Sequence, residues 1–335
     1  MAKRGSNSRS GAPLAGGTGV ARTRDAASDG LSVRKRAQSV AVPPSSVNGR
    51  AHGPSAALQA SRISRGSSAA DNRARPIGVF DSGIGGLTVL KELTALLPGE
   101  DFIYLGDTAR LPYGTKSNEV IVRYSRENTE FLLAKGIKLL VVACNTSSAV
   151  ALEEIERHTM VPVIGVIEPG ARAAVKASRT GKIGVIGTEA TIASGAYTRA
   201  IQSLKARAEI YTRACPLLVP LVEEGWTDND IAERTVTHYL ESLKASGIDT
   251  LLLGCTHYPL LRGMFERVMG PRVKMVDSAI ATAGAVAEKL NELKLARRDG
   301  GGAQSFFVTE TPERFVRVGR RFIGPRVESA VRIER

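Results

Sequence analysis

The sequence is poor in aromatic residues and in cysteine, and it has no long hydrophobic run. Phe, Trp and Tyr make up 5% of the 335 residues against a hydrophobic fraction of 43%, which favours aliphatic strands and helices over an aromatic-rich β architecture. No apolar stretch approaches the roughly 20 residues of a membrane-spanning helix. The three cysteines include no C-x-x-C pair, which argues against a secreted disulfide framework and a structural zinc site. We therefore expect a cytoplasmic protein without a membrane segment.

Acidic residues are scarce in the first 75 residues. This segment has 13 Lys and Arg but only three Asp, so it holds +10 of the net charge of +13. Its Ser-, Ala- and Gly-rich composition lacks apolar periodicity, which predicts a disordered basic N-terminal extension over residues 1–75. Two alternatives stay open, because such a composition is also typical of transit peptides and could contact nucleic acid.

From Pro76 onward, strands and helices alternate. The predicted strands are Ile77–Phe80, Asp101–Asp107, Leu139–Cys144, Val163–Ile167, Lys182–Gly187, Glu209–Thr212, Leu251–Cys255, Val273–Val276 and Phe306–Val308. The predicted helices are Leu87–Leu97, Glu119–Lys135, Ser147–His158, Ile192–Ala206, Asp228–Ala245 and Ile280–Leu295, of which the fifth has Thr227 and Asp230 as an apparent capping box. Aliphatic strands without alternation are typical of buried parallel sheets.

The alternating pattern runs through two similar cycles. Gly78 and Gly184 occupy matching strands 106 residues apart, and Cys144 and Cys255 follow matching strands 111 residues apart. A duplicated unit explains both intervals. We expect an α/β fold of two pseudo-symmetric three-layer domains with mainly parallel sheets and a site in the cleft between them.

Each cycle delivers one thiol to the carboxyl end of a strand, where open α/β sheets build their sites. The two stretches are KLLVVACNTSSAV, with Cys144, and LLLGCTHYPLL, with Cys255. Two thiols in one cleft suit proton transfer across a carbon centre, because one thiolate removes a proton and the other thiol returns one to the opposite face. Asp81 and His257 are the candidates that poise these thiols, and Glu223 could orient His257.

Some of these residues have other interpretations. A lone cysteine after a strand is more often a small core residue, which is how we interpret Cys215, and disulfide exchange between the two matched thiols stays open. His158 and His238 fit helix surfaces. The turn Gly83–Gly86 lacks the spacing of a nucleotide-binding loop, so we interpret it as close backbone packing beside a ligand.

Five motifs resemble those of the glutamate racemases, in the aspartate/glutamate racemase superfamily. The resemblance extends from about Pro76 to the C-terminus and rests, in chain order, on GVFDSGIGGLTVL, LGDTARLPYG, VVACNTSSA, VPLVEEG and LLLGCTHYPLL. The 75-residue extension has no counterpart in the family pattern.

The resemblance implies interconversion of L-glutamate and D-glutamate without pyridoxal phosphate, a metal or another cofactor, supplying D-glutamate for peptidoglycan. Cys144 would act on D-glutamate with help from Asp81, and Cys255 on L-glutamate with help from His257 and Glu223. The substrate would be held by Asp81, Ser82, Tyr113, Gly114, Asn145, Thr146, Thr188, Thr256 and His257.

The resemblance also implies a homodimer and two interleaved domains. Residues 76–172 and 282–335 would form the first domain, and residues 173–281 the second. Racemisation of another amino acid such as aspartate is the alternative activity. A nucleic-acid-binding module that uses the basic extension is the alternative from a different class.

Overall fold

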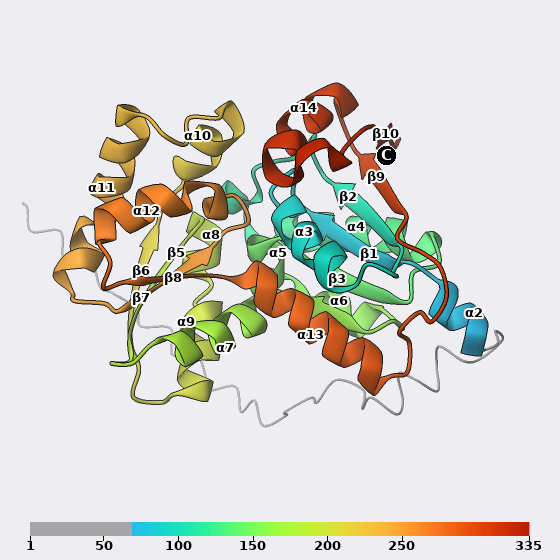
Figure 1. Ribbon diagram of the computed structural model, residues 1–335, viewed down its shortest axis with the longest axis horizontal. Helices are drawn as coiled ribbons and strands as arrows, with labels where there is room; N and C mark the ends of the chain where they lie inside the picture. Colours follow the sequence, from blue (N-terminus) through green and yellow to red (C-terminus); the bar gives the residue numbers. More distant parts are fainter. Residues whose placement is uncertain (1–68, 335) are drawn as a thin grey trace, which may run out of the picture. The chain divides into compact units, whose positions relative to one another are not determined.

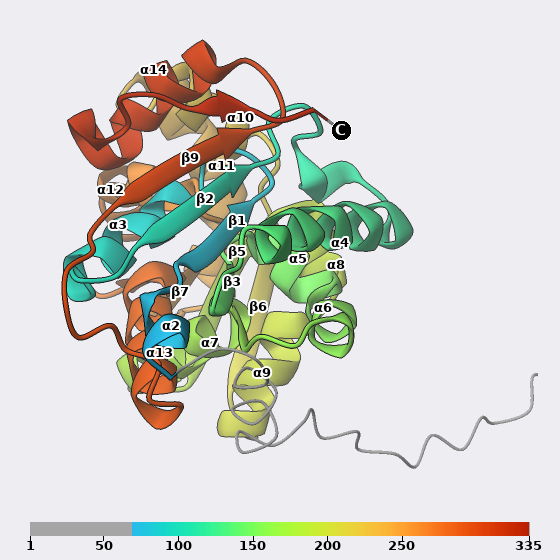
Figure 2. The ribbon, with the colours of Figure 1, turned by 90° about the vertical axis from the view of Figure 1, so that its right-hand side faces the viewer.

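A computed structural model describes residues 69–334, and they form two sheets in which every strand pairing is parallel. The six-stranded sheet has the spatial order β10 (Val331–Arg332), β9 (Gln304–Val308), β2 (Phe102–Gly106), β1 (Ile77–Asp81), β3 (Leu139–Val142) and β4 (Val163–Gly165). The four-stranded sheet has the order β6 (Glu209–Ala214), β5 (Lys182–Gly187), β7 (Thr250–Gly254) and β8 (Lys274–Asp277). Figure 2 shows the first sheet with its strands pointing in one direction. The predicted α/β class is confirmed.

The order of strands supports the duplication seen in the sequence. The segment β2-β1-β3-β4 of the larger sheet and the whole order β6-β5-β7-β8 of the smaller one follow the same plan. Cys144 follows β3 and Cys255 follows β7, so the two thiols come from equivalent strands of the two sheets. The larger sheet is extended on the β2 side by β9 and β10.

Helices cover both faces of the central strands. In β1, Ile77 and Val79 pack in one cluster with Leu87 of α3, whereas Phe80 packs in another cluster with Leu132 of α4. Burial on both faces explains why the strands are continuously apolar. The α-helices are α2 (Ala69–Ala74), α3 (Leu87–Leu96), α4 (Asn118–Ala134), α5 (Asn145–Val150), α6 (Leu152–His158), α7 (Ile167–Ala177), α8 (Glu189–Ala193), α9 (Ala196–Leu204), α10 (Leu218–Glu224), α11 (Asp230–Ala245), α12 (Arg262–Met269), α13 (Ser278–Glu292) and α14 (Pro312–Ile323).

The chain leaves the larger sheet after β4, builds the smaller sheet and returns with β9. Helix α13 contacts both α3 and α7, and Figure 1 shows it running from the smaller sheet toward the larger one. Short 3-10 turns complete the fold at η1 (Tyr113–Thr115), η2 (Tyr258–Leu261) and η3 (Gly324–Arg326). The domain boundaries at 172/173 and 281/282 stay predictions.

Several predicted helices differ from the observed ones. The segment predicted as one helix from Ser147 divides at Ala151 into α5 and α6. The helix predicted from Ile192 is divided by Gly195, whose φ of 65° ends α8 and begins α9. The strand predicted to reach Ile167 ends at Gly165, and α7 begins at Ile167.

The predicted capping box of α11 is wrong. Asn229 is the residue that caps the helix, and its Oδ1 accepts a hydrogen bond from the Ala232 amide at 2.9 Å. An asparagine side chain is as good a cap as serine or threonine, and it lies two residues closer to the helix than Thr227.

The predicted disordered extension extends too far by at least six residues, because Ala69–Ala74 form α2. The rest of that prediction, and the proposed transit-peptide or nucleic-acid role of the tail, concern residues outside the described part. None of the helices between residues 69 and 334 combines the length and the hydropathy needed to span a membrane.

Candidate active site

A cavity receives residues from both halves of the duplicated fold. About 380 Å³ of space in and around it is not filled by atoms, and this volume includes open solvent. Its lining consists of Ser82, Gly83, Leu111, Pro112, Tyr113, Gly114, Cys144, Asn145, Thr146, Thr188, Val219, Glu223, Cys255, Thr256 and His257. The predicted cysteine pair therefore shares one cavity, and every predicted site residue except Asp81 lines it. Among the described residues that line it, none is a Lys or Arg.

Cys144 occupies the N-cap of α5. Its Sγ accepts from the Ser147 amide at 3.5 Å and lies 3.5 Å from the Ser82 hydroxyl oxygen, to which the thiol donates. Burial and, second, the charge of Asp81 raise the pKa of this thiol to about 11. Cys144 is therefore a thiol near neutral pH, able to give up a proton only to a strong base.

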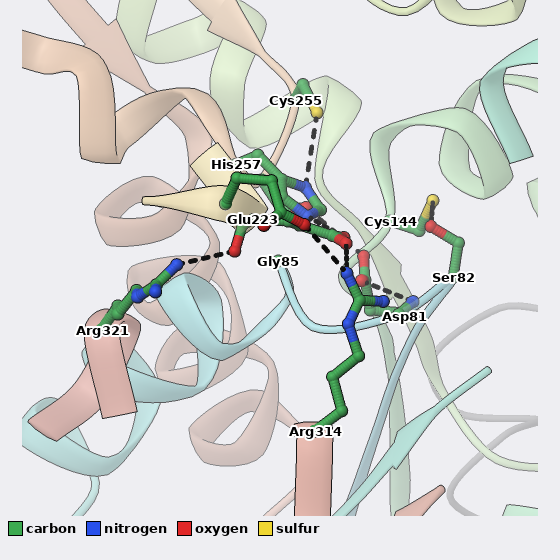
Figure 3. A network of polar contacts seen from close by, with 12 residues as sticks. Asp81, Ser82, Gly85, Cys144, Glu223, Cys255, His257, Arg314 and Arg321 are labelled. Atoms are coloured by element: carbon green, nitrogen blue, oxygen red, sulfur yellow. Dashed lines mark hydrogen bonds and ion pairs between the residues drawn. The ribbon is translucent and has the colours of Figure 1, made fainter. Parts of the chain in front are cut away.

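Cys255 begins a line of three polar side chains, which Figure 3 shows. Its Sγ lies 3.9 Å from Nδ1 of His257, and Nε2 of that imidazole lies 3.1 Å from Oε1 of Glu223. Burial lowers the pKa of His257, but its contacts with Cys255 and Glu223 outweigh burial and raise it to about 10. Burial raises the pKa of Glu223, yet hydrogen bonding and charge from His257 and Arg314 bring it below its ordinary value. An imidazolium on His257 paired with a carboxylate on Glu223 is the arrangement that these shifts favour.

Asp81 ends β1 and is fully buried. Its Oδ2 accepts from the Gly83 amide at 2.9 Å, and its Oδ1 accepts from the Thr256 hydroxyl at 3.4 Å. Burial raises the pKa of this carboxyl, and the positive charge of His257 opposes the shift. Asp81 does not line the cavity, so a direct contact with substrate stays a prediction.

The glycine turn after β1 packs against the segment that contains Cys255. A Cβ on Gly85 would collide with Thr256 and His257, and a Cβ on Gly86 would lie 2.6 Å from Cβ of Asp81. Gly83 lines the cavity. The close backbone packing predicted for the turn is confirmed, whereas a ligand beside it stays a prediction.

Polar groups without full charge dominate the rest of the lining. The hydroxyls of Thr146, Thr188 and Thr191 lie 2.9–3.2 Å from one another. Asn145 Oδ1 accepts from the Tyr197 hydroxyl at 2.6 Å, and in the described part of the chain its buried Nδ2 has no acceptor. Because Tyr197 fixes the orientation of this amide, Nδ2 is left as a donor for a bound molecule.

The remaining cysteine and histidines lie elsewhere. Cys215 is fully buried in the apolar core, as predicted, and all three cysteines are free thiols. His158 and His238 are exposed on helices, also as predicted. Over residues 69–334, no cluster of three or more His, Cys, Asp or Glu side chains could hold a metal ion.

Sequence reasoning missed two kinds of contributor. Leu111, Pro112 and Val219 add apolar walls. Arg314, which contacts Glu223, belongs to α14, a helix that was not predicted. The signal for α14 was present: Pro312 stands at a first helical position, and apolar residues recur at helical spacing after it.

Comparisons with known proteins give relatives in sequence and in structure. The sequence profile of the Asp/Glu/Hydantoin racemase family matches residues 77–286. A glutamate racemase of Geobacter metallireducens is 56% identical over 251 residues, covering 75% of this chain and 93% of the relative. The crystal structure of a glutamate racemase isoform from Bacillus anthracis is 38% identical with a TM-score of 0.74, covering 78% of this chain and 98% of that one. A glutamate racemase from Francisella tularensis, solved in complex with D-glutamate, is 37% identical with a TM-score of 0.72 and covers 78% and 97%.

Proposed function

The chain belongs to the glutamate racemase family within the Asp/Glu/Hydantoin racemases, and we propose that it interconverts L-glutamate and D-glutamate through two thiols. The observation that carries the mechanism is that Cys144 and Cys255, from equivalent strands of the two sheets, line the same cavity. A thiolate on one side of the α-carbon removes the proton, and a thiol on the other side supplies a new one. Configuration inverts, and no proton is gained or lost overall.

The two thiols have different surroundings, which suits opposite roles. Cys255 has His257 beside it, so a thiolate there gains a hydrogen-bonded cation. That Cys255 acts on L-glutamate is what the resemblance to the family implies. Cys144, buried and near Asp81, holds its proton until it protonates the α-carbanion from the opposite face. After one turnover the thiolate is on Cys144, and the enzyme is ready for D-glutamate.

Neutral donors would hold the two substrate carboxylates and the amine. The free Nδ2 of Asn145 and the hydroxyls of Thr146 and Thr188 supply such donors, and a relative with the same fold was solved with D-glutamate. The predicted contacts of Ser82, Tyr113, Gly114, Thr256 and His257 belong to the same proposal. Buried, oriented donors favour a charged ligand because they need no reorganisation when it binds.

The proposal follows the resemblance in three further respects. It includes no cofactor, since the thiols carry the proton transfer. It assigns the D-glutamate to peptidoglycan synthesis in the cytoplasm, and it includes a homodimer. Sedimentation velocity measures the dimer directly.

Replacing either thiol tests the mechanism. We expect Cys144→Ser and Cys255→Ser each to lower racemisation by at least about 10²-fold, the contribution of one positioned acid or base. Circular dichroism of glutamate solutions follows the reaction from either enantiomer. Cys215→Ala is the matched control, because that thiol lies in the core and outside the cavity.

Two results would contradict the proposal. Full activity in either serine variant would remove the two-thiol mechanism. A panel containing glutamate and aspartate tests the substrate, and preference for aspartate would replace glutamate as the substrate.

A further inference from the structure

Helix α14 brings two arginines to one residue of α10. Nη2 of Arg314 donates to Oε2 of Glu223 at 3.2 Å, and Nη1 of Arg321 donates to the Glu223 backbone oxygen at 2.7 Å. The two arginines are seven residues apart, about two turns, so they project from the same face of α14. Figure 3 shows both guanidinium groups directed at Glu223.

The surrounding residues are fitted to this contact. Gly225 ends α10 with a φ of 80°, and a Cβ there would lie 2.8 Å from Cζ of Arg321. Any other residue would both strain the backbone and displace the arginine. Phe322, which like the two arginines belongs to α14, contacts the His257 ring edge-to-face at a centroid distance of 5.7 Å.

Glu223 links this contact to the thiol. Its two carboxylate oxygens are divided, Oε1 facing His257 and Oε2 facing Arg314. A carboxylate held at both oxygens has its orientation fixed, and so has the imidazole that it pairs with. We propose that Arg314 is a positioning residue for the proposed racemisation: it holds Glu223 so that His257 supports the thiolate form of Cys255.

The other charged groups around this line do not replace Arg314. Glu224 lies 3.7 Å from Arg314 but has a side chain that is 68% exposed, so water screens it. Asp81 adds negative charge near His257. Arg321 acts on the backbone oxygen of Glu223, not on its carboxylate. Arg314 is therefore the positively charged residue that contacts Oε2 of Glu223.

The inference rests on the proposed function and predicts a directional effect. The free enzyme has two forms, with the thiolate on Cys255 for L-glutamate or on Cys144 for D-glutamate. Loss of the Arg314 charge disfavours the first form, so KM for L-glutamate rises relative to KM for D-glutamate. Enantiomers have equal free energies in water, so kcat/KM must stay equal in the two directions, and the ratio of the kcat values rises by the same factor.

The experiment compares Arg314→Gln with wild type in both directions. We expect KM(L)/KM(D) to rise roughly two- to fivefold, the size of effect typical of a half-exposed ion pair. The Arg314 side chain is 38% exposed, so we expect the variant to fold, which far-ultraviolet circular dichroism checks. Arg314→Lys keeps the charge and should restore most of the ratio. Arg317→Gln removes the same charge from an exposed position on the same helix and should leave the ratio unchanged.

The outcomes separate the two proposals. If wild type is active and Arg314→Gln leaves KM(L)/KM(D) unchanged or lowers it, the role of Arg314 is overturned. The proposed function then still stands. An equal change in Arg317→Gln also overturns the role of Arg314, because the effect would then be one of general charge. Wild type that does not racemise glutamate overturns the proposed function and this inference with it.

Discussion

Asp81 illustrates how one buried charge sets the pH range of a neighbouring group. Burial and then the charge of Asp81 raise the pKa of the Cys144 thiol to about 11. A two-thiol mechanism needs one thiol protonated, so activity should fall as the pH rises toward that value. Asp81→Asn removes the charge and lowers the pKa of Cys144. We therefore expect the basic limb of the kcat/KM profile to move to lower pH in this variant.

The pH profile of Asp81→Asn needs a charge control. Asp228→Asn removes an acid whose side chain is 79% exposed, and its basic limb should coincide with that of wild type. If the basic limb of the kcat/KM profile of Asp81→Asn stays in place or moves to higher pH, Asp81 does not act on the Cys144 thiol through its charge.

At the scale of single residues, the sequence predicted the residues that line the cavity better than the residues that hold them in place. Cys144, Cys255 and His257 stand in short motifs at strand ends, where chain topology alone brings side chains together. Arg314 stands in no such motif, and its partner Glu223 lies 91 residues away in the chain. A contact of that kind depends on tertiary packing, which periodicity does not encode.

At the scale of elements, strands were predicted well because buried parallel strands have a distinct composition. Lys182–Gly187 was predicted with its observed bounds, and the other eight predicted strands differ by at most two residues at either end. The short strand β10 was not predicted. Helices were less predictable where one residue with a non-helical backbone conformation divides them. Gly195, with its positive φ, separates α8 from α9 within one apolar pattern, and the pattern continues because both helices face the same core.

The corrected cap of α11 gives a prediction for this scale. Asn229→Ala removes the side-chain acceptor of the Ala232 amide and should lower the free energy of unfolding by about 1 kcal/mol. Thr227→Ala, at the residue first predicted as the cap, should change it by less than about 0.5 kcal/mol. Urea unfolding of the two variants compares them directly. A larger loss in Thr227→Ala would restore the capping box that the sequence suggested.

At the scale of the whole molecule, strand β3 has a functional residue at one end and a stabilising one at the other. Cys144 follows the carboxyl end of β3, whereas Lys138 precedes its first residue. The Lys138 side chain is fully buried, and Nζ donates to Arg73 O at 2.7 Å, to Glu100 Oε2 at 2.5 Å and to Leu295 O at 3.0 Å. This ammonium joins α2, the segment before β2 and the segment that follows α13.

Replacing Lys138 should therefore reduce stability without changing the chemistry. Lys138→Met leaves the Glu100 carboxylate buried and without its cation, at a cost of about 3–5 kcal/mol. The double variant Lys138→Met/Glu100→Gln removes both charges and should lose less than the single variant. Denaturant unfolding measures the loss, and kcat per folded molecule should equal that of wild type because the cavity is at the other end of β3. A double variant as unstable as Lys138→Met would mean that the hydrogen bonds of Nζ to Arg73 and Leu295, and not its charge, hold these three segments together.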